Sequence, residues 1–158
     1  MACLWISLMF RIVLVQPDIP QNTGNIGRLC VGLDAELHLV YPLGFILDDK
    51  RVKRAGLDYW QHLKLIKHDS WDDFLKTYPD DRKFFLTTKT KQSYTAINFE
   101  KNDFLIFGCE TKGLPKEILE KHWDQAVTIP MIGKIRSLNL SNAVAVVSYE
   151  AMRQITLD

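Results

Sequence analysis

The segment Ile129–Met152, IPMIGKIRSLNLSNAVAVVSYEAM, contains the end of an expected strand, a polar loop and an expected helix. The helix is indicated by apolar or small residues spaced three and four apart, which form one buried stripe. This stripe consists of Leu140, Ala143, Val144, Val147, Ser148 and Ala151. The loop before it is crowded with polar residues, which are Arg136, Ser137, Asn139, Ser141 and Asn142. Because a helix amino terminus carries unsatisfied N–H donors and a partial positive charge, this region suits the polar or anionic part of a ligand.

A plainer interpretation of the same segment is a well-capped helix, with Asn139 or Ser141 as the N-cap residue. Capping accounts for one of the polar residues. It does not account for the whole group, which lies beside Lys134 and Arg136. We therefore interpret the segment as a ligand-binding loop followed by a helix.

The length of 158 residues and the ordinary composition, with 47% hydrophobic residues, predict one compact domain. A net charge of +1 neither indicates nor excludes a nucleic-acid partner, because a local basic patch can suffice. The apolar runs are only strand-sized, so no membrane span is expected. The first strand begins just after Met9, so we expect residues 1–8 to be an extension and residues 9–158 to be the domain. The cysteines show no disulfide framework, which favours a cytoplasmic location.

Strand-like and helix-like segments alternate along the chain. Strands are expected at residues 10–15, 35–42, 63–68, 83–89, 103–108 and 125–131. Helices are expected between them, the first one capped by Asn22 or Thr23 and a later one by Ser70. This alternation predicts an α/β domain with a mostly parallel sheet and helices on both faces.

Three polar loops follow three late strands, at residues 86–89, 108–113 and 129–142. In a parallel sheet such loops emerge at the same edge, where open α/β sheets place their ligands. The loops are rich in glycine and poor in ionisable groups. This character suits recognition of a nucleoside by main-chain groups better than acid–base hydrolysis. We expect Gly108 to be a glycine because the main chain there approaches the nucleoside closely.

Other chemistries have weaker support in the sequence. No G-x-G-x-x-G follows the first strand, and GCETKG is not a P-loop. Cys109 could be a thiol nucleophile, but the four histidines show no sign of converging on it, so an inert cysteine is favoured. No cluster of His, Cys or carboxylate residues has metal-ligand spacing, so no metal is expected. The basic segment 50–54 is either a solvated helix face or, with Tyr59 and Trp60 nearby, a surface that binds phosphates.

Three long motifs carry a family resemblance. PDIPQNTGNIGRL at residues 17–29, FGCETKGLP at 107–115 and IPMIGKIRSLNLSNAVAVVSYEA at 129–151 resemble the motifs of the SPOUT (SpoU–TrmD) RNA methyltransferases. The closest resemblance is to the small single-domain tRNA 2′-O-methyltransferases of the TrmL or YibK type. Two positions depart from the family pattern, since Gly27 replaces a larger residue and Cys109 replaces a proline or another small residue.

The resemblance implies a C-terminal trefoil knot, a homodimer, and metal-free transfer of a methyl group from S-adenosyl-L-methionine to the wobble ribose of tRNA, on cytidine or uridine. It places the cofactor-binding residues at Leu86, Gly108, Ile129, Met131, Ser137 and Leu138. The dimer is expected to bury a face of the last helix that includes Val144, Val147 and Tyr149. An rRNA methyltransferase and an RNA-binding protein without catalytic activity remain alternatives on the same fold.

Arg28 is the expected catalytic residue within the resemblance. Family accounts often treat this arginine as a base, but its guanidinium is always protonated, so we expect it to clamp a developing oxyanion or a phosphate. Glu110 is expected to order the middle loop. The expected substrate or RNA contacts are Asn22 and Asn25, which also fix the first loop, together with Arg136 and Asn142.

Overall fold

The computed structural model describes residues 9–48, 50 and 58–156. The expected extension 1–8 lies outside the described residues, and so does most of the segment 48–62, which contains the basic residues 50–54 and is expected to form a capped helix. Neither prediction is tested. The end of that basic segment, Asp58–His62, forms a short 3-10 helix, η1. None of the described helices is both long enough and apolar enough to cross a membrane.

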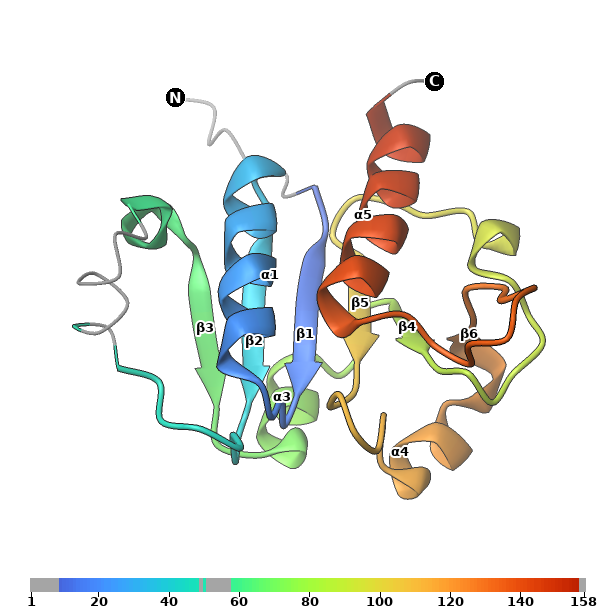
Figure 1. Cartoon of the computed structure of the whole chain (residues 1–158), viewed down its shortest axis with the longest axis horizontal. Coiled ribbons are helices and arrows are strands. Elements are labelled where there is room, and N and C mark those ends of the chain that lie inside the picture. Colours follow the sequence, from blue (N-terminus) through green and yellow to red (C-terminus); the bar gives the residue numbers. More distant parts are fainter. Residues whose placement is uncertain (1–8, 49, 51–57, 157–158) are drawn as a thin grey trace.

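Six strands form one sheet in the order β3-β2-β1-β5-β4-β6 (Figure 1). Their bounds are β1 Arg11–Val15, β2 Glu36–Val40, β3 Leu65–His68, β4 Lys83–Leu86, β5 Phe104–Phe107 and β6 Ala126–Val127. Every strand pair in this sheet is parallel. The predicted α/β class with a parallel sheet is therefore confirmed, although each strand is shorter than expected.

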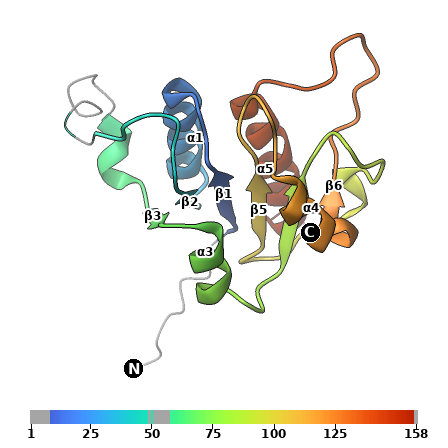
Figure 2. The same ribbon diagram turned by 90° about the horizontal axis from the view of Figure 1, so that it is seen from below.

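The central strands β1 and β5 are buried along their whole length because helices cover both faces of the sheet. On one face, α1 (Pro20–Gly32) and α5 (Leu140–Thr156) pack side by side and contribute Ile26, Cys30, Val144 and Val147 to the core. On the other face lie α3 (Trp71–Thr77) and α4 (Lys116–Lys121), which contribute Phe74, Ile118 and Leu119 (Figure 2). Two further 3-10 turns are η2 (Tyr94–Ala96) and η3 (Trp123–Gln125).

Helix α1 begins earlier than predicted. Pro20 occupies its first turn and Ile19 is the N-cap residue, without a side-chain cap. Proline suits this position because its φ is already helical and its missing N–H would have no partner there. The expected caps Asn22 and Thr23 are wrong, since both are buried inside the first turns. The Ser70 cap is confirmed, because its Oγ accepts a hydrogen bond from Asp73 N at 3.1 Å.

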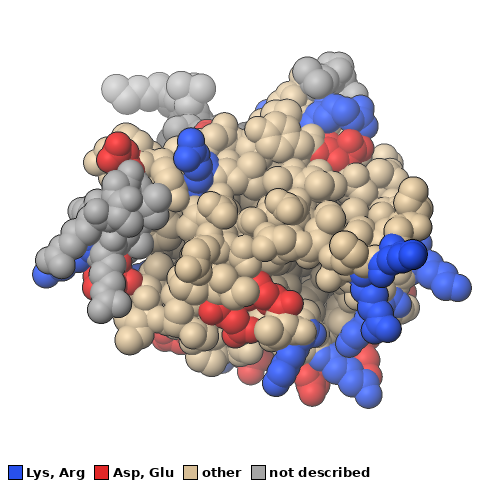
Figure 3. Space-filling view, viewed as in Figure 1, with Lys and Arg blue, Asp and Glu red and all other residues tan. Residues whose placement is uncertain are grey.

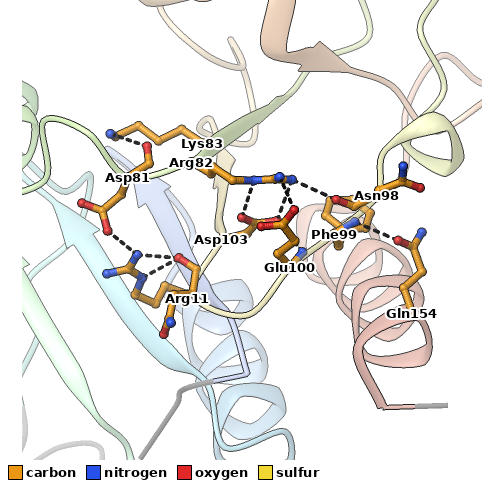
Figure 4. Close-up of polar contacts among 10 residues, drawn as sticks. Arg11, Asp81, Arg82, Lys83, Asn98, Phe99, Glu100, Asp103 and Gln154 are labelled. Atoms are coloured by element: carbon orange, nitrogen blue, oxygen red, sulfur yellow. Dashed lines mark hydrogen bonds and ion pairs between the residues drawn. The ribbon is translucent and has the colours of Figure 1, made fainter. Parts of the chain in front are cut away.

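The amino-terminal edge of the sheet is held by a network of ion pairs and hydrogen bonds (Figure 4). Arg11 pairs with Asp81 at 2.7 Å, and Arg82 Nε pairs with the buried Asp103 at 2.9 Å. Gln154 extends the network to α5, because its Oε1 accepts a hydrogen bond from Phe99 N at 2.8 Å. These contacts join the starts of β1, β4 and β5 to the end of the last helix.

Candidate functional site

A cavity of about 250 Å³ lies at the carboxyl ends of β4, β5 and β6. Its walls are the three loops that the sequence grouped together and the first turn of α5. It is lined by all six residues predicted to bind a cofactor, which are Leu86, Gly108, Ile129, Met131, Ser137 and Leu138. The structure therefore brings these six residues, which are spread over more than fifty positions of the sequence, into one site.

The cavity combines apolar walls with a cationic rim. Its apolar lining includes Phe107, Leu114 and Leu140 in addition to the predicted residues. Lys89, Lys112 and Arg136 line it with exposed side chains, one from each of the three loops. Figure 3 shows Lys and Arg side chains gathered over the loop between β6 and α5, whereas the adjoining face of α1 and α5 is mostly uncharged. This lining suits a ligand that has an apolar or aromatic part and approaches together with negative charge.

Glu110 is the one carboxylate in the cavity lining, and its oxygens are engaged by the chain itself. They accept hydrogen bonds from the main-chain N–H groups of Asp18 at 2.7 Å and Ile19 at 3.1 Å, and from Asn22 Nδ2 at 3.3 Å. The carboxylate thus satisfies donors at the start of α1, where negative charge is favoured. Glu110 was expected to order the middle loop, and the structure shows that it joins this loop to the loop after β1.

Asn22 continues this connection to the third loop. Its Oδ1 accepts a hydrogen bond from Asn139 Nδ2 at 3.1 Å. Asn139 is the N-cap residue of α5, because its Oδ1 accepts a hydrogen bond from Ser141 N at 2.9 Å. Asn22 is only 5% exposed and both ends of its amide are bonded, so the structure corrects its predicted contact with RNA. Its side chain faces the other two loops, which fits the loop-fixing role that was also expected.

Gly108 is required by the packing of its own loop. A Cβ atom at this position would lie 2.1 Å from Gly113 C and 2.1 Å from Leu114 N. The close approach of the turn 109–113 therefore requires a glycine here on its own, in addition to the close approach to a ligand that was expected. This turn is closed by a hydrogen bond from Gly113 N to Cys109 O at 3.0 Å, and Gly113 itself has a φ of +69°, which favours glycine.

The side-chain hydrogen bonds of Cys109 within the described residues all stay in its own turn. Its Sγ accepts a hydrogen bond from Lys112 N at 3.4 Å and lies 3.8 Å from Thr111 Oγ1. His38 and His68 pair with each other in the core at 2.9 Å, and His122 stacks on Phe85. This arrangement gives Cys109 no histidine base. Within the described residues, no group of three or more His, Cys, Asp or Glu side chains is placed to hold a metal ion.

Arg28 lies outside the cavity, in a neighbouring shallow groove between α1 and α5. The groove is lined by Asn25, Arg28, Leu29, Gly32, Ser141, Asn142, Ala145 and Tyr149. The first turn of α5 separates the two regions, because Leu140 and Ala143 line the cavity while Ser141 and Asn142 line the groove. The predicted site residues therefore form two groups, with Arg136 in the cavity and Asn25, Arg28 and Asn142 in the groove.

Tyr59 lies beside Arg28 and was not predicted as part of this site. The Arg28 Cζ atom is 5.9 Å from the centroid of the Tyr59 ring, and Tyr59 Oη donates a hydrogen bond to Gly24 O at 2.9 Å. Burial raises the pKa of Tyr59, and the charge of Arg28 partly opposes this effect. The available sequence signal was Gly27, which leaves room for a bulky ring on one face of α1 and stands where the family has a larger residue.

The last helix buries different residues from those expected at a dimer interface. Val144 and Val147 are fully buried within the chain, where they pack in the core against β1 and α1. They cannot also form a surface that a second copy covers, so this part of the expectation is wrong. The outward face of α5 instead presents Val146, which is 37% exposed, and Tyr149, which is 52% exposed.

The fold and the cavity define an α/β protein with a ligand site at the carboxyl ends of a parallel sheet. Residues 9–149 match the SpoU rRNA Methylase family. The chain belongs to this family, which confirms the resemblance carried by the three motifs.

Individual relatives cover nearly the whole chain. A tRNA (cytidine(34)-2′-O)-methyltransferase of Saccharophagus degradans is 49% identical over 148 residues, which span 93% of this chain and 96% of the relative. A solved structure described as giving insight into 2-OH methylation of C/U34 on tRNA is 45% identical, with a TM-score of 0.88, and the match covers 94% of this chain and 97% of that one. The SpoU methyltransferase AviRb of Streptomyces viridochromogenes, solved in complex with AdoMet, is 25% identical with a TM-score of 0.77, over 91% of this chain and 57% of AviRb.

Proposed function

We propose that this protein methylates the ribose 2′-oxygen of the wobble nucleotide, cytidine or uridine, in tRNA, with S-adenosyl-L-methionine as methyl donor. The observation that carries the proposal is the cavity at the sheet edge, in which all six expected cofactor residues meet. The similarity to a tRNA (cytidine(34)-2′-O)-methyltransferase over 96% of that relative supports the substrate. We also propose a cytoplasmic location, which the proposed reaction on tRNA supports.

The residues of the cavity fit this methyl donor. Leu86 ends β4, and Gly108 and Ile129 follow the ends of β5 and β6. Their main-chain groups at the cavity would hold the adenosine part by hydrogen bonds. Met131 and Leu138 supply apolar walls from the third loop. The bound donor supplies an electrophilic methyl group on a sulfonium centre. The chain's own task is then to exclude water, align the ribose hydroxyl and stabilise its developing negative charge, and we propose that it does this without a metal.

Arg28 is the proposed source of that stabilisation. It is exposed, and no carboxylate forms an ion pair with it in the described part of the chain, so its charge remains available for a substrate oxygen. Asn25 and Asn142 lie in the same groove and would contact the ribose or a neighbouring phosphate. Arg136 lines the cavity and would contact the RNA from the opposite side of the first turn of α5.

We further propose a homodimer, which the separation of these two groups supports. Within one chain the first turn of α5 lies between Arg28 and the cavity, so a second copy would bring its own groove to the cavity of the first. The exposed side chains of Val146 and Tyr149 extend the groove along α5 and would be covered in this arrangement. We also propose that residues 9–158 form the catalytic domain and that the return of the chain from the edge strand β6 to α5, beside α1, forms a trefoil knot.

The proposal is tested by incubating the purified protein with S-adenosyl-L-methionine carrying a tritiated methyl group and with tRNA or rRNA from cells that lack the gene. We expect label in tRNA, at the 2′-oxygen of position 34 when the modified nucleotides are mapped. Label confined to rRNA would establish the rRNA alternative. Binding of tRNA without transfer, under conditions in which the cofactor binds, would establish an RNA-binding protein without catalytic activity.

A further inference from the structure

The short helix η1 packs against the first half of α1 through two consecutive aromatic residues, Tyr59 and Trp60. Tyr59 is half-buried and donates its hydroxyl hydrogen bond to Gly24 O at 2.9 Å. Trp60 is 7% exposed and lies against Gly27. The two aromatic residues therefore contact α1 at positions three residues apart, on one face of the helix.

Gly27 of α1 makes room for this contact. A Cβ atom at Gly27 would lie 3.0 Å from Trp60 Cζ3 and 3.3 Å from Leu63 Cδ2. Glycine inside a helix is otherwise unfavourable, because it loses more conformational freedom than other residues when it is ordered. Trp60 thus accounts for the unusual glycine at position 27 and anchors η1 on the helix. Tyr59 packs less tightly against α1 than Trp60 does. A Cβ atom at Gly24 would lie 3.9 Å from the Tyr59 hydroxyl, which is an ordinary contact distance, so this position does not require a glycine.

Tyr59 instead contacts Arg28 through its ring, and it contacts the helix turn before Arg28 through its hydroxyl. The guanidinium of Arg28 lies over the Tyr59 ring at 5.9 Å, within the range of a cation–π contact. The Tyr59 hydroxyl binds the carbonyl of Gly24, which is the residue that an Arg28 N–H faces in a regular helix, four positions earlier. Among the described residues, no ion pair or side-chain hydrogen bond holds the Arg28 guanidinium, so the ring is the contact that orients it.

We infer that Tyr59 is a positioning residue for the methyl transfer, which holds the Arg28 guanidinium in place by its ring and fixes the helix turn below it by its hydroxyl. This inference rests on the proposed function, because it assigns Tyr59 a role through Arg28. A flexible arginine would have to be ordered anew for each substrate. The tyrosine ring limits its conformations beforehand and leaves all of its N–H donors available to the ribose oxygen or a phosphate.

The kinetic test compares Tyr59→Leu, which removes the ring and the hydroxyl, with Tyr59→Phe, which keeps the ring. For Tyr59→Leu we expect kcat to fall roughly tenfold or more, as for a displaced catalytic group, with cofactor affinity unchanged in calorimetry. Tyr59→Phe should recover most of this loss. In an Arg28→Lys background, Tyr59→Leu should have a much smaller effect, because residues that act as a unit are not additive.

The matched control is Tyr78→Leu. Tyr78 is also half-buried and also lies near an arginine, since Arg11 Cζ is 5.3 Å from its ring centroid, but the pair is at the amino-terminal edge of the sheet. Tyr78→Leu should lower the midpoint of denaturant unfolding and leave kcat unchanged. If Tyr59→Leu behaves in the same way as this control, Tyr59 is only a structural residue and the inference is wrong.

A second readout does not depend on activity. The ultraviolet absorbance is measured as a function of pH, and the curve of Tyr59→Phe is subtracted from that of the wild type to give the titration of Tyr59. The same subtraction is then made with Arg28→Ala present in both proteins. Because the Arg28 charge favours the tyrosinate, its removal should raise the pKa of Tyr59. An unchanged pKa would show that the two groups are not in contact and would overturn the inference. Absence of methyl transfer in the wild type would overturn the proposed function instead, and the titration would still decide whether Tyr59 holds Arg28.

Discussion

Charged side chains are paired at the amino-terminal edge of the parallel sheet, whereas the cations that line the cavity at its carboxyl-terminal edge are unpaired within the described residues. At the amino-terminal edge, Arg11 is 10% exposed and pairs with Asp81, while Arg82 pairs with a carboxylate, Asp103, that is 2% exposed (Figure 4). At the carboxyl-terminal edge, Lys89, Lys112 and Arg136 line a cavity with exposed side chains and form no ion pair within the described residues.

The paired charges stabilise the fold, whereas the exposed cations around the cavity are available to bind a ligand. A buried carboxylate must be paired or it is costly, so the amino-terminal network is closed within the chain. Exposed cations around a cavity gain little from each other and can contact an anionic partner such as an RNA backbone. The same contrast applies to hydrogen bonding, because the one carboxylate of the cavity lining, Glu110, is already satisfied by the start of α1.

The largest effect is expected for Gly108→Val, at the carboxyl-terminal edge. Because a Cβ here would overlap the main chain of Gly113 and Leu114, the turn cannot form unchanged. We expect a loss of about 3 kcal/mol in the free energy of unfolding, together with loss of cofactor binding in calorimetry. Gly133→Ala is the control, because its Cβ would meet no atom within 4 Å. Normal stability of Gly108→Val would contradict the packing argument.

Arg28→Ala should separate function from stability most clearly. Since Arg28 is exposed and outside the cavity, we expect unfolding and cofactor affinity to remain nearly unchanged. Methyl transfer to tRNA should fall by about a hundredfold or more, or about 2.7 kcal/mol, because one preorganised charge contact is lost. Substantial rescue by Arg28→Lys would favour simple charge stabilisation, and no rescue would favour bidentate positioning. Full activity of Arg28→Ala in the tritium assay would refute the mechanism.

Asp103→Ala should show the reverse behaviour at the amino-terminal edge. It leaves Arg82 without its buried partner and Glu100 N without the acceptor at 2.8 Å. Because Arg82 is 43% exposed and water can replace part of the pairing, we expect a loss of about 2 kcal/mol in denaturant unfolding, below the value for a fully buried pair. Methyl transfer at low temperature should be unchanged. Burial raises the pKa of Asp103, so the neutral Asp103→Asn should cost less than Asp103→Ala.

The smallest effects are expected for single substitutions of the cavity cations. Lys89→Ala, Lys112→Ala and Arg136→Ala should each weaken tRNA binding by about 1 kcal/mol and reduce the salt dependence of binding by about one unit of slope. Lys64→Ala is the control, because Lys64 does not line the cavity and its Nζ pairs with Asp34 Oδ1 at a distance of 2.7 Å. Equal salt slopes for all four variants would show that the cavity rim does not contact RNA phosphates.

Much of the fold could be predicted from sequence because it depends on local patterns. All six strands were found, since the apolar runs of β1 and β5 are typical of strands buried on both faces. The cap at Ser70 was found because its partner lies only three residues away. The start of α1 was wrong because polar side chains were preferred as caps over Pro20, which begins the helix.

The sequence by itself determined the α/β class, the three loops at one edge and the six residues that meet in the cavity, because the alternation of strands and helices and the motif resemblance suffice for these. Only the tertiary structure decided that Asn22 is turned inward, that the buried stripe with Val144 and Val147 packs within the chain and not against a second copy, and that Arg28 lies across α5 from the cavity. It alone showed that Tyr59, thirty-one positions after Arg28, lies beneath the guanidinium. The physical reason is that the direction of a side chain depends on contacts between elements distant in sequence, which local spacing does not encode.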